Sequence, residues 1–425
     1  MAKRPISTKS NTGSLTFIFI TVLVDVMGLA VIIPVLPTLI QELTGEGISK
    51  AADYGGLMMM AFAATQFAFA PLMGELSDRY GRRPILLLAL TGLGIDYLFH
   101  AFAPTIGWLF ISRIIAGVFG SSHTVASAYI ADISTPKNKA KNFGILGAAF
   151  SLGFILGPAI GGVCAQWGYQ VPFIVAACFS LLNVLFGLFV LPESLPKEDR
   201  RKVEVSKAIP FVSLFHLGKY KSLLLFVIAF TATFLAGQVL PSTWAFFTMK
   251  AYDWTDVDVG ISLAVVGVLV GIAQGFLVGK SVKKFGSKNV IIGGFILWTF
   301  GMFAFAMASE SYMLYLALIP YALGAVASPV IQGVMSNAVP KNEQGNLQGA
   351  LTSLISLTAI FGPILFTKVF YLYTKDGADP YYPGASFLLA GGILLVSTFI
   401  ALFAIRKMNE IFEKDQVLDE VKEEE

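Results

Sequence analysis

The sequence predicts an all-α polytopic membrane protein with twelve transmembrane helices in two similar, pseudo-symmetric bundles of six. Hydrophobic residues make up 56% of the 425 residues and charged residues only 13%, whereas soluble domains are about one-quarter charged. Twelve apolar segments are long enough to cross a bilayer as helices. Short patterns in the first half also recur in the second half at a nearly constant distance.

Each expected span is close to, or longer than, the ~20 apolar residues that a membrane helix needs. The spans are 15–38, 54–74, 84–103, 106–130, 142–166, 171–191, 222–247, 258–280, 288–308, 312–337, 344–373 and 383–406. The expected domains are an N-terminal segment at 1–14, a first bundle at 15–191, a charged central loop at 192–221, a second bundle at 222–406 and an acidic tail at 407–425.

Basic residues are concentrated in alternate loops of this topology. One set of loops holds the clusters of Lys and Arg, and the other holds only Lys50, Lys250 and Lys375. Cytoplasmic loops of membrane proteins carry an excess of positive charge. We therefore expect both termini, the central loop and the tail to be cytoplasmic, in a multi-pass protein of the inner membrane.

The two halves share short patterns at one offset. Residues 74–81 (GELSDRYG) reappear as 279–286 (GKSVKKFG), a shift of 205 positions, and the Gly-Pro pair at 157–158 reappears at 362–363 with the same shift. Chance similarity between glycine-rich helices is the alternative. Agreement in corresponding loops and spans favours duplication of a six-helix unit.

Several of these patterns resemble a known family. Residues 74–84 (GELSDRYGRRP) resemble the signature loop of the major facilitator superfamily. Span 5 resembles the antiporter motif of its drug exporters through Gly153, Gly157, Pro158, Gly161 and Gly162. Together with residues 25–37 and 332–349, they look like the tetracycline-efflux group of drug:proton antiporters. That resemblance implies proton-coupled efflux of a small hydrophobic or amphipathic compound.

The signature loop is expected to turn tightly over residues 75–83 and to expose Asp78 beside three arginines. The resemblance implies that it closes the cytoplasmic side, with gate residues Gly74, Asp78, Arg79, Gly81, Arg82, Arg83 and Asp132. We expect Asp78 to face the positive N-terminal end of span 11 in the other half. The second copy has Lys283 in place of Asp78, which predicts an asymmetric gate. For Arg82 and Arg83, a role as ordinary cytoplasmic positive charges is the alternative.

Ionisable residues inside spans usually mark a pathway, because burying them in hydrocarbon is costly. Asp25 lies 10 residues into span 1, about 15 Å deep, with no charged neighbour three or four residues away. We expect it to carry the proton, since desolvation favours its protonated form; a structural carboxyl is the alternative. Asp96 and Arg113 lie at equal depth in neighbouring spans, so we expect an ion pair with a coupling or structural role. His100 follows Asp96 by one turn.

The expected substrate cavity consists of polar and aromatic residues inside the spans: Gln66, His123, Gln238, Gln274, Trp298 and Gln332. The resemblance also marks a departure, because the tetracycline exporters carry an acid in span 9 and a histidine in span 8. This chain has Trp298 and Val270 at those positions. The proton-handling residues are therefore concentrated in the first half, which leaves tetracycline itself open as the cargo.

Other functions find less support in the sequence. It has neither a Walker motif nor a catalytic constellation, so we expect no ATP dependence, no enzyme activity and no cofactor beyond the coupling proton. The two cysteines, Cys164 and Cys178, lack metal-binding spacing. We expect a monomer with a small-molecule substrate, in contact with lipid and not with nucleic acid. The alternatives are a proton symporter or facilitator for a neutral nutrient, and a sensor that kept the fold.

Overall fold

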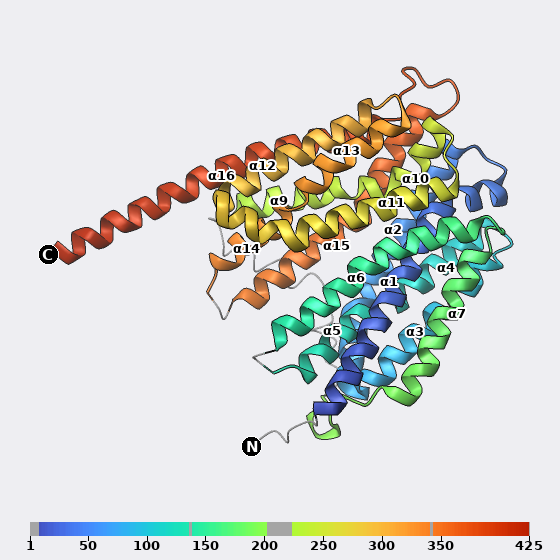
Figure 1. Cartoon of the computed structure of the whole chain (residues 1–425), viewed down its shortest axis with the longest axis horizontal. Coiled ribbons are helices and arrows are strands. Elements are labelled where there is room, and N and C mark those ends of the chain that lie inside the picture. Colours follow the sequence, from blue (N-terminus) through green and yellow to red (C-terminus); the bar gives the residue numbers. More distant parts are fainter. Residues whose placement is uncertain (1–7, 136–137, 202–222, 341–342, 425) are drawn as a thin grey trace. The chain divides into compact units, whose positions relative to one another are not determined.

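The structure is a computed structural model that describes residues 8–135, 138–201, 223–340 and 343–424 (Figure 1). These residues form helices and connecting turns without a β-strand. The helices are α1 (Thr8–Thr44), α2 (Ile48–Tyr80), α3 (Arg82–Ala101), α4 (Ile106–Phe119), α5 (Ser122–Ile133), α6 (Lys139–Ala165), α7 (Val171–Val190), η1 (Lys197–Asp199), α9 (Leu224–Gly237), α10 (Val239–Tyr252), α11 (Asp256–Ile272), η5 (Ala273–Leu277), α12 (Val278–Met307), α13 (Ser311–Gly324), α14 (Ala327–Asn337), α15 (Gln344–Thr374) and α16 (Ala385–Glu424). Parts of the expected N-terminal segment and of the central loop, 1–7 and 202–221, lie outside the described residues.

The helices are long and apolar enough for a multi-pass membrane protein. Among the described residues, 11 helical stretches could cross a bilayer. One of them, Asp256–Met307, has 52 residues, more than twice the length of one crossing. Its backbone leaves helical geometry at Gly286, where φ is 76°. The all-helical membrane architecture is confirmed, whereas the count of twelve crossings and the cytoplasmic termini remain predictions.

Three expected spans are each divided into two helices. The span predicted at 106–130 is α4 followed by α5, that at 222–247 contains α9 and α10, and that at 312–337 is α13 followed by α14. Each break lies at or beside a glycine, namely Gly120, Gly237 or Gly324. Glycine is a poor helix former because it loses the most backbone freedom on folding. Hydropathy detects the membrane segment but not the break within it.

The signature loop is shorter than the sequence predicts. Helix α2 continues to Tyr80 and α3 begins at Arg82, so Gly81 alone separates them. Its φ of 108° is a conformation that residues with a side chain rarely adopt. The prediction of a turn over 75–83 was therefore wrong in extent. Asp78 and Arg82 lie instead on consecutive helix ends, which brings their side chains together.

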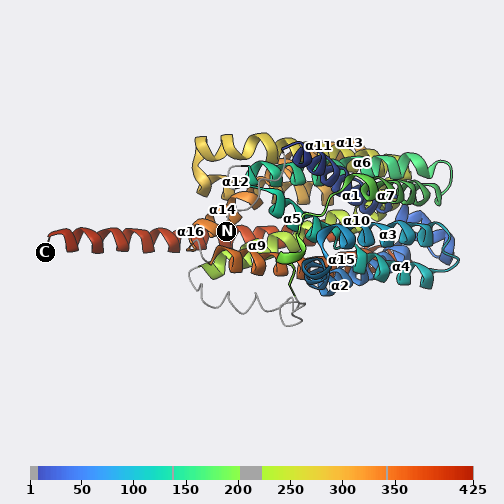
Figure 2. The ribbon, with the colours of Figure 1, turned by 90° about the horizontal axis from the view of Figure 1, so that it is seen from below.

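The described chain divides into two compact units. The first contains Met1–Pro210, Pro241–Val268 and Pro363–Tyr381, and thus all of the first bundle together with parts of α10, α11 and α15. Within it α1 packs along α6, and α3 lies beside α4 and α7 (Figures 1 and 2). The second unit contains Phe211–Leu240, Leu269–Gly362 and Tyr382–Glu425. Its core joins α9, α12, α14 and α16 around Phe226, Phe230, Phe295 and Met335.

Close approach of α1 and α6 depends on the glycines of the predicted antiporter motif. A Cβ atom at Gly157 would lie 2.6 Å from the backbone oxygen of Met27, and one at Gly161 would lie 2.4 Å from that of Val31. Gly153 faces Val26 in the same way. These three glycines are four residues apart, so they form one face of α6. They let α1 lie directly against α6 and fix the position of the helix that carries Asp25.

Candidate functional site

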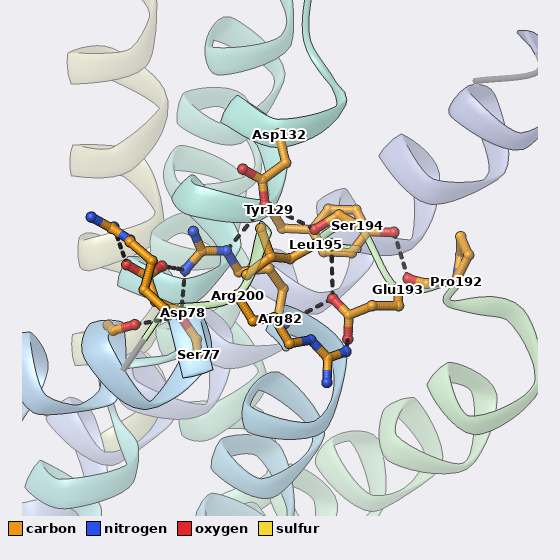
Figure 3. A network of polar contacts seen from close by, with 12 residues as sticks. Ser77, Asp78, Arg82, Tyr129, Asp132, Pro192, Glu193, Ser194, Leu195 and Arg200 are labelled. Atoms are coloured by element: carbon orange, nitrogen blue, oxygen red, sulfur yellow. Dashed lines mark hydrogen bonds and ion pairs between the residues drawn. The ribbon is translucent and has the colours of Figure 1, made fainter. Parts of the chain in front are cut away.

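A polar network gathers at the end of α2 and the start of α3, the location of the signature loop (Figure 3). Its centre is the buried guanidinium of Arg82, which contacts Asp78 at 2.5 Å and Asp132, at the end of α5, at 3.1 Å. Arg82 also donates to the hydroxyl of Ser77 at 2.6 Å. One arginine therefore pairs with two carboxylates from different helices, which ties α2, α3 and α5 together.

The segment after α7 completes this network. The backbone N–H of Arg82 donates to Glu193 Oε1 at 2.8 Å, and Arg200 lies 3.7 Å from Glu193 Oε2. Ser194 donates to Asp132 at 3.1 Å. A Cβ atom at Gly81 would lie 2.3 Å from Glu193 Oε2. Glycine thus suits position 81 because of its backbone angle, and a side chain there would displace the Glu193 carboxylate.

The central loop reaches Asp78 as well. Arg201 contacts the second carboxylate oxygen of Asp78, and its backbone N–H donates to the Asp78 carbonyl at 3.1 Å. Both carboxylate oxygens of Asp78 therefore have arginine partners within the first unit. The expected contact between Asp78 and the N-terminal end of span 11 concerns the second unit and stays a prediction.

Two other arginines of the predicted gate lie at the edge of the network. Arg79 stacks over the ring of its neighbour Tyr80, with 5.0 Å from its guanidinium carbon to the ring centroid. Arg83 donates to the carbonyl of Leu188 near the end of α7 at 2.6 Å. Gly74 accepts a hydrogen bond from Ser77 at 2.7 Å through its carbonyl. Among the described residues, the ion pairs of this region involve neither Arg79 nor Arg83.

Asp25 is buried in α1, with only 5% of its surface exposed. One carboxylate oxygen accepts a short hydrogen bond from Ser122, the first residue of α5. The other oxygen, Oδ1, is buried without a hydrogen-bond partner among the described residues. The break between α4 and α5 is what places Ser122 next to α1. Asp25 is therefore a lone acid whose described partner is a hydroxyl group.

The predicted ion pair between Asp96 and Arg113 is present and is part of a larger buried cluster. Arg113 Nη2 lies 3.4 Å from Asp96 Oδ2 and 3.2 Å from His100 Nδ1. Ser112 contacts both Asp96 and His100 through short hydrogen bonds. The His100 ring stacks on Phe173 with centroids 5.2 Å apart. Acid, imidazole and guanidinium are thus held in one apolar enclosure.

Tyr97 lies between Asp25 and this cluster. Its side chain is 3% exposed, and its hydroxyl is buried without a partner among the described residues. A Cβ atom at Gly28, one turn after Asp25, would lie 2.2 Å from that hydroxyl. The glycine therefore makes room for the Tyr97 hydroxyl on the face of α1 that carries Asp25. Tyr97 was not among the site residues expected from the sequence, because an aromatic residue inside a span is usually a packing residue.

Two glutamines of the expected cavity cap broken spans. Gln66 Nε2 donates to the carbonyl of Gly120 at 2.8 Å, at the break between α4 and α5. Gln274 Nε2 approaches the carbonyl of Ala325 at 3.4 Å, at the break between α13 and α14. Gly120 and Ala325 are 205 positions apart, the offset of the sequence repeat. These amides satisfy carbonyls that the breaks leave without a helical partner.

The other expected cavity residues lie in varied surroundings. Gln332 donates to Gln348 at 2.7 Å, and Gln238 packs against Gly362. His123 is exposed and meets Phe150 edge-on at 5.9 Å. Trp298 is buried and its ring meets that of Tyr321 at 5.9 Å. Their role as a substrate cavity stays a prediction.

An ion cluster that the sequence did not predict joins α2 to α15 within the first unit. Asp53 pairs with Lys50 at 3.0 Å and with Lys368 at 3.2 Å. Both ammonium groups also lie over the ring of Tyr371, at 5.2 Å and 5.0 Å from its centroid. The cluster lies at the opposite end of α2 from the signature loop. It links the first sequence repeat with a helix of the second.

Comparison with known proteins shows the family. The chain matches the family model of the Major Facilitator Superfamily over residues 18–281 and 232–418. It is 36% identical over 363 residues to the class C tetracycline resistance protein of Escherichia coli, covering 85% of this chain and 90% of the relative. It is also 36% identical over 400 residues to the class H tetracycline resistance protein of Pasteurella multocida, covering 93% and 97%.

Solved structures share the fold. A bacterial homolog of the human lysosomal transporter Spinster, in an inward-facing conformation, aligns with a TM-score of 0.78 at 16% identity, covering 95% of this chain and 99% of that chain. A D-xylose-proton symporter aligns with a TM-score of 0.73 at 18% identity, covering 94% and 97%. Together with the sequence relatives, the fold identifies a secondary active transporter of the drug-efflux type. The chain belongs to the major facilitator superfamily and, within it, to the group of the tetracycline resistance proteins.

Proposed function

We propose that this transporter exports a tetracycline-like compound in exchange for protons, and that Asp25 carries the proton. The observation that supports this most directly is the environment of Asp25, a buried carboxyl group with one hydroxyl partner and one oxygen that has no partner among the described residues. An isolated charge in such surroundings costs several kcal/mol. Asp25 is therefore expected to hold a proton when enclosed and to release it when water reaches it.

Asp96 offers the contrast within the same bundle. Arg113 and Ser112 compensate its charge, so the Asp96 carboxylate can stay ionised while buried. Asp96 is therefore better placed to act as a fixed counter-charge for Arg113 than to carry a proton. Tyr97 follows Asp96 in α3, and its hydroxyl lies over Gly28, one turn after Asp25 in α1, so Asp25 lies near the cluster. A proton arriving at Asp25 would thereby change the field around Arg113.

The proposed cargo is a flat, partly polar molecule. The names of the curated relatives point to tetracycline, and the expected cavity residues combine amides with aromatic rings, which suits such a ligand. Trp298 and Val270 stand where the resemblance implies an acid and a histidine, so coupling would depend on the first bundle. One copy of the chain, without a cofactor beyond the proton and without enzymatic chemistry, suffices for this cycle.

The test uses the purified protein in vesicles with an imposed pH gradient and a panel of tetracyclines and fluorescent dyes. The wild type should move at least one of these compounds against its gradient, and Asp25→Asn should abolish gradient-driven movement while leaving exchange of labelled substrate at equilibrium. Asp376→Asn, in an exposed loop, is the matched control and should transport normally.

Three results would count against the proposal. Undiminished gradient-driven transport by Asp25→Asn would remove that residue from the coupling step. Movement of a neutral solute in the same direction as the proton would support a symporter instead. A lack of movement of any compound by the folded wild type would favour a sensor that kept the fold.

A further inference from the structure

The second copy of the signature loop adjoins a cavity that transport of a drug does not explain. The cavity has a volume of about 290 Å³ and lies wholly within the second unit, between α12 and the junction of α13 and α14. Its wall is largely apolar, with Leu277, Leu297, Leu323 and Val326 among its residues. Ser281 and Asn289 contribute the polar part, at the end nearest the loop.

A missing side chain helps to keep this cavity open. Gly293 lines it, and a Cβ atom at Gly293 would meet no heavy atom of the described part of the chain within 4 Å. Gly294 next to it is packed, since its Cβ would lie 2.8 Å from Ala327. The surface of α12 around the cavity is exposed and apolar at Phe285 (55%) and Ile296 (54%). In a bilayer such a surface meets lipid chains.

Uncompensated positive charge borders the polar end of the cavity. Three lysines each precede a cavity-lining residue by one position, two of them before the break of α12 at Gly286 and one after it. These pairs are Lys280 with Ser281, Lys284 with Phe285, and Lys288 with Asn289. Lys283 adds a fourth charge, and all four lysines are exposed. Within the described residues no acidic side chain pairs with any of them.

We propose that this site binds an anionic phospholipid, with an acyl chain in the cavity and the phosphate on the lysines. An acyl chain fits an apolar cavity that adjoins an apolar surface, and a phosphate supplies the negative charge that the lysines lack. The lysines lie where an apolar span ends, which is the depth of lipid headgroups. A neutral or cationic drug would fill the cavity but leave the lysines unpaired.

The first experiment measures thermal unfolding of the full chain in detergent with added phosphatidylglycerol or phosphatidylcholine. Phosphatidylglycerol should raise the unfolding midpoint of the wild type by several degrees more than phosphatidylcholine does. Gly293→Leu fills the cavity from within and should remove at least half of that difference. Gly392→Leu, at another half-buried helical glycine with no heavy atom within 4 Å of its Cβ position, should retain it.

The second experiment tests the charge. Lys284→Gln combined with Lys288→Gln should reduce the number of phosphatidylglycerol molecules retained in native mass spectrometry at least threefold relative to phosphatidylcholine. Lys407→Gln, at an exposed lysine of α16, should retain as many as the wild type. If the variants do not fold, the wild type still decides: its preference for phosphatidylglycerol should shrink as salt rises, because screening weakens the attraction.

Three results would overturn the proposal. The two lipids could shift the unfolding midpoint of the wild type equally, or the preference for phosphatidylglycerol could be independent of salt. The third is a stabilisation by phosphatidylglycerol that remains in Gly293→Leu. A different result would make the cavity an entrance for substrate instead. In that case tetracycline, but not phosphatidylglycerol, stabilises the wild type, and Gly293→Leu removes this stabilisation. The lipid site is independent of the proposed proton coupling, because Asp25→Asn should leave lipid retention unchanged.

Discussion

The two copies of the signature loop have similar sequences, but their basic residues lie in different surroundings. In the first copy, Arg82 pairs with Asp78 and Asp132, and Arg200 and Arg201 from the central loop pair with Glu193 and Asp78, so these charges belong to a defined network of ion pairs. Around residues 279–288, four lysines lie exposed, and the described residues offer them no acid. The turn of the first half is therefore held by ion pairs, whereas the turn of the second half presents exposed lysines.

The largest expected effect comes from the centre of the first network. Arg82→Met would leave two carboxylates without their shared partner, and losing one member of a buried ion pair costs about 3–5 kcal/mol. We expect a clear fall in the unfolding midpoint and loss of transport. Lys288→Met in the second copy should change the midpoint little. Similar losses for both variants would show that the two loops are equivalent after all.

A second pair of variants compares the two glycines that form the turns. Gly81→Ala and Gly286→Ala both force a side chain into a backbone region of positive φ that essentially only glycine adopts, which costs about 1–3 kcal/mol. Only at Gly81 would the new methyl group also displace Glu193, because a Cβ atom at Gly286 would meet no heavy atom of the described residues within 4 Å. We expect Gly81→Ala to lower the unfolding midpoint further and to slow transport. Equal shifts in a thermal scan would mean that the contact with Glu193 does not matter.

A smaller effect is expected at the edge of the network. The side chain of Arg201 is 63% exposed, and exposed ion pairs contribute about 1 kcal/mol or less. Arg201→Gln should therefore lower the unfolding midpoint slightly at low salt and not at high salt. Transport rates measured at the two salt concentrations show whether the central loop restrains Asp78. A salt-independent loss would instead point to the backbone contact.

The smallest effect is expected from restoring the acid in the second copy. Lys283→Asp recreates the residue type of Asp78 but has no arginine equivalent to Arg82, since Ser287 occupies that place. An exposed substitution of this kind changes stability by about 0.5 kcal/mol or less. Unfolding and transport should both stay close to the wild type. A gain in stability above that level would show that the acid alone can organise the loop.

Much of the fold could be predicted because hydropathy reports membrane depth. The apolar segments gave the helices, and equal depth in adjacent spans paired Asp96 with Arg113. The antiporter motif also singled out Gly153, Gly157 and Gly161, which the structure places against α1. Hydropathy gives the depth of a residue along the membrane normal, however, and not the direction in which its side chain points from the helix. The Tyr97 hydroxyl over Gly28 and the cavity beside the second copy of the signature loop both depend on that missing direction.

The parts that the sequence could not predict lie where the chain leaves helical periodicity. Glu193, Arg200 and Arg201 follow the last span of the first bundle, and a loop has no repeat from which to infer its partners. Asp53 and Lys368 pair although more than 300 positions separate them in the chain. Nothing in the sequence pattern indicates that two charged residues in different halves are in contact. The breaks within spans were hidden because glycine is common in membrane helices.

The capping of two broken spans by Gln66 and Gln274 has a consequence for how the halves bend. A bare carbonyl inside hydrocarbon costs several kcal/mol, so an uncapped break would push each span back toward a straight rod. The amide removes that penalty at matching places in both repeats. The two halves thus share a way of stabilising a bent span, whereas the charges around their signature loops differ.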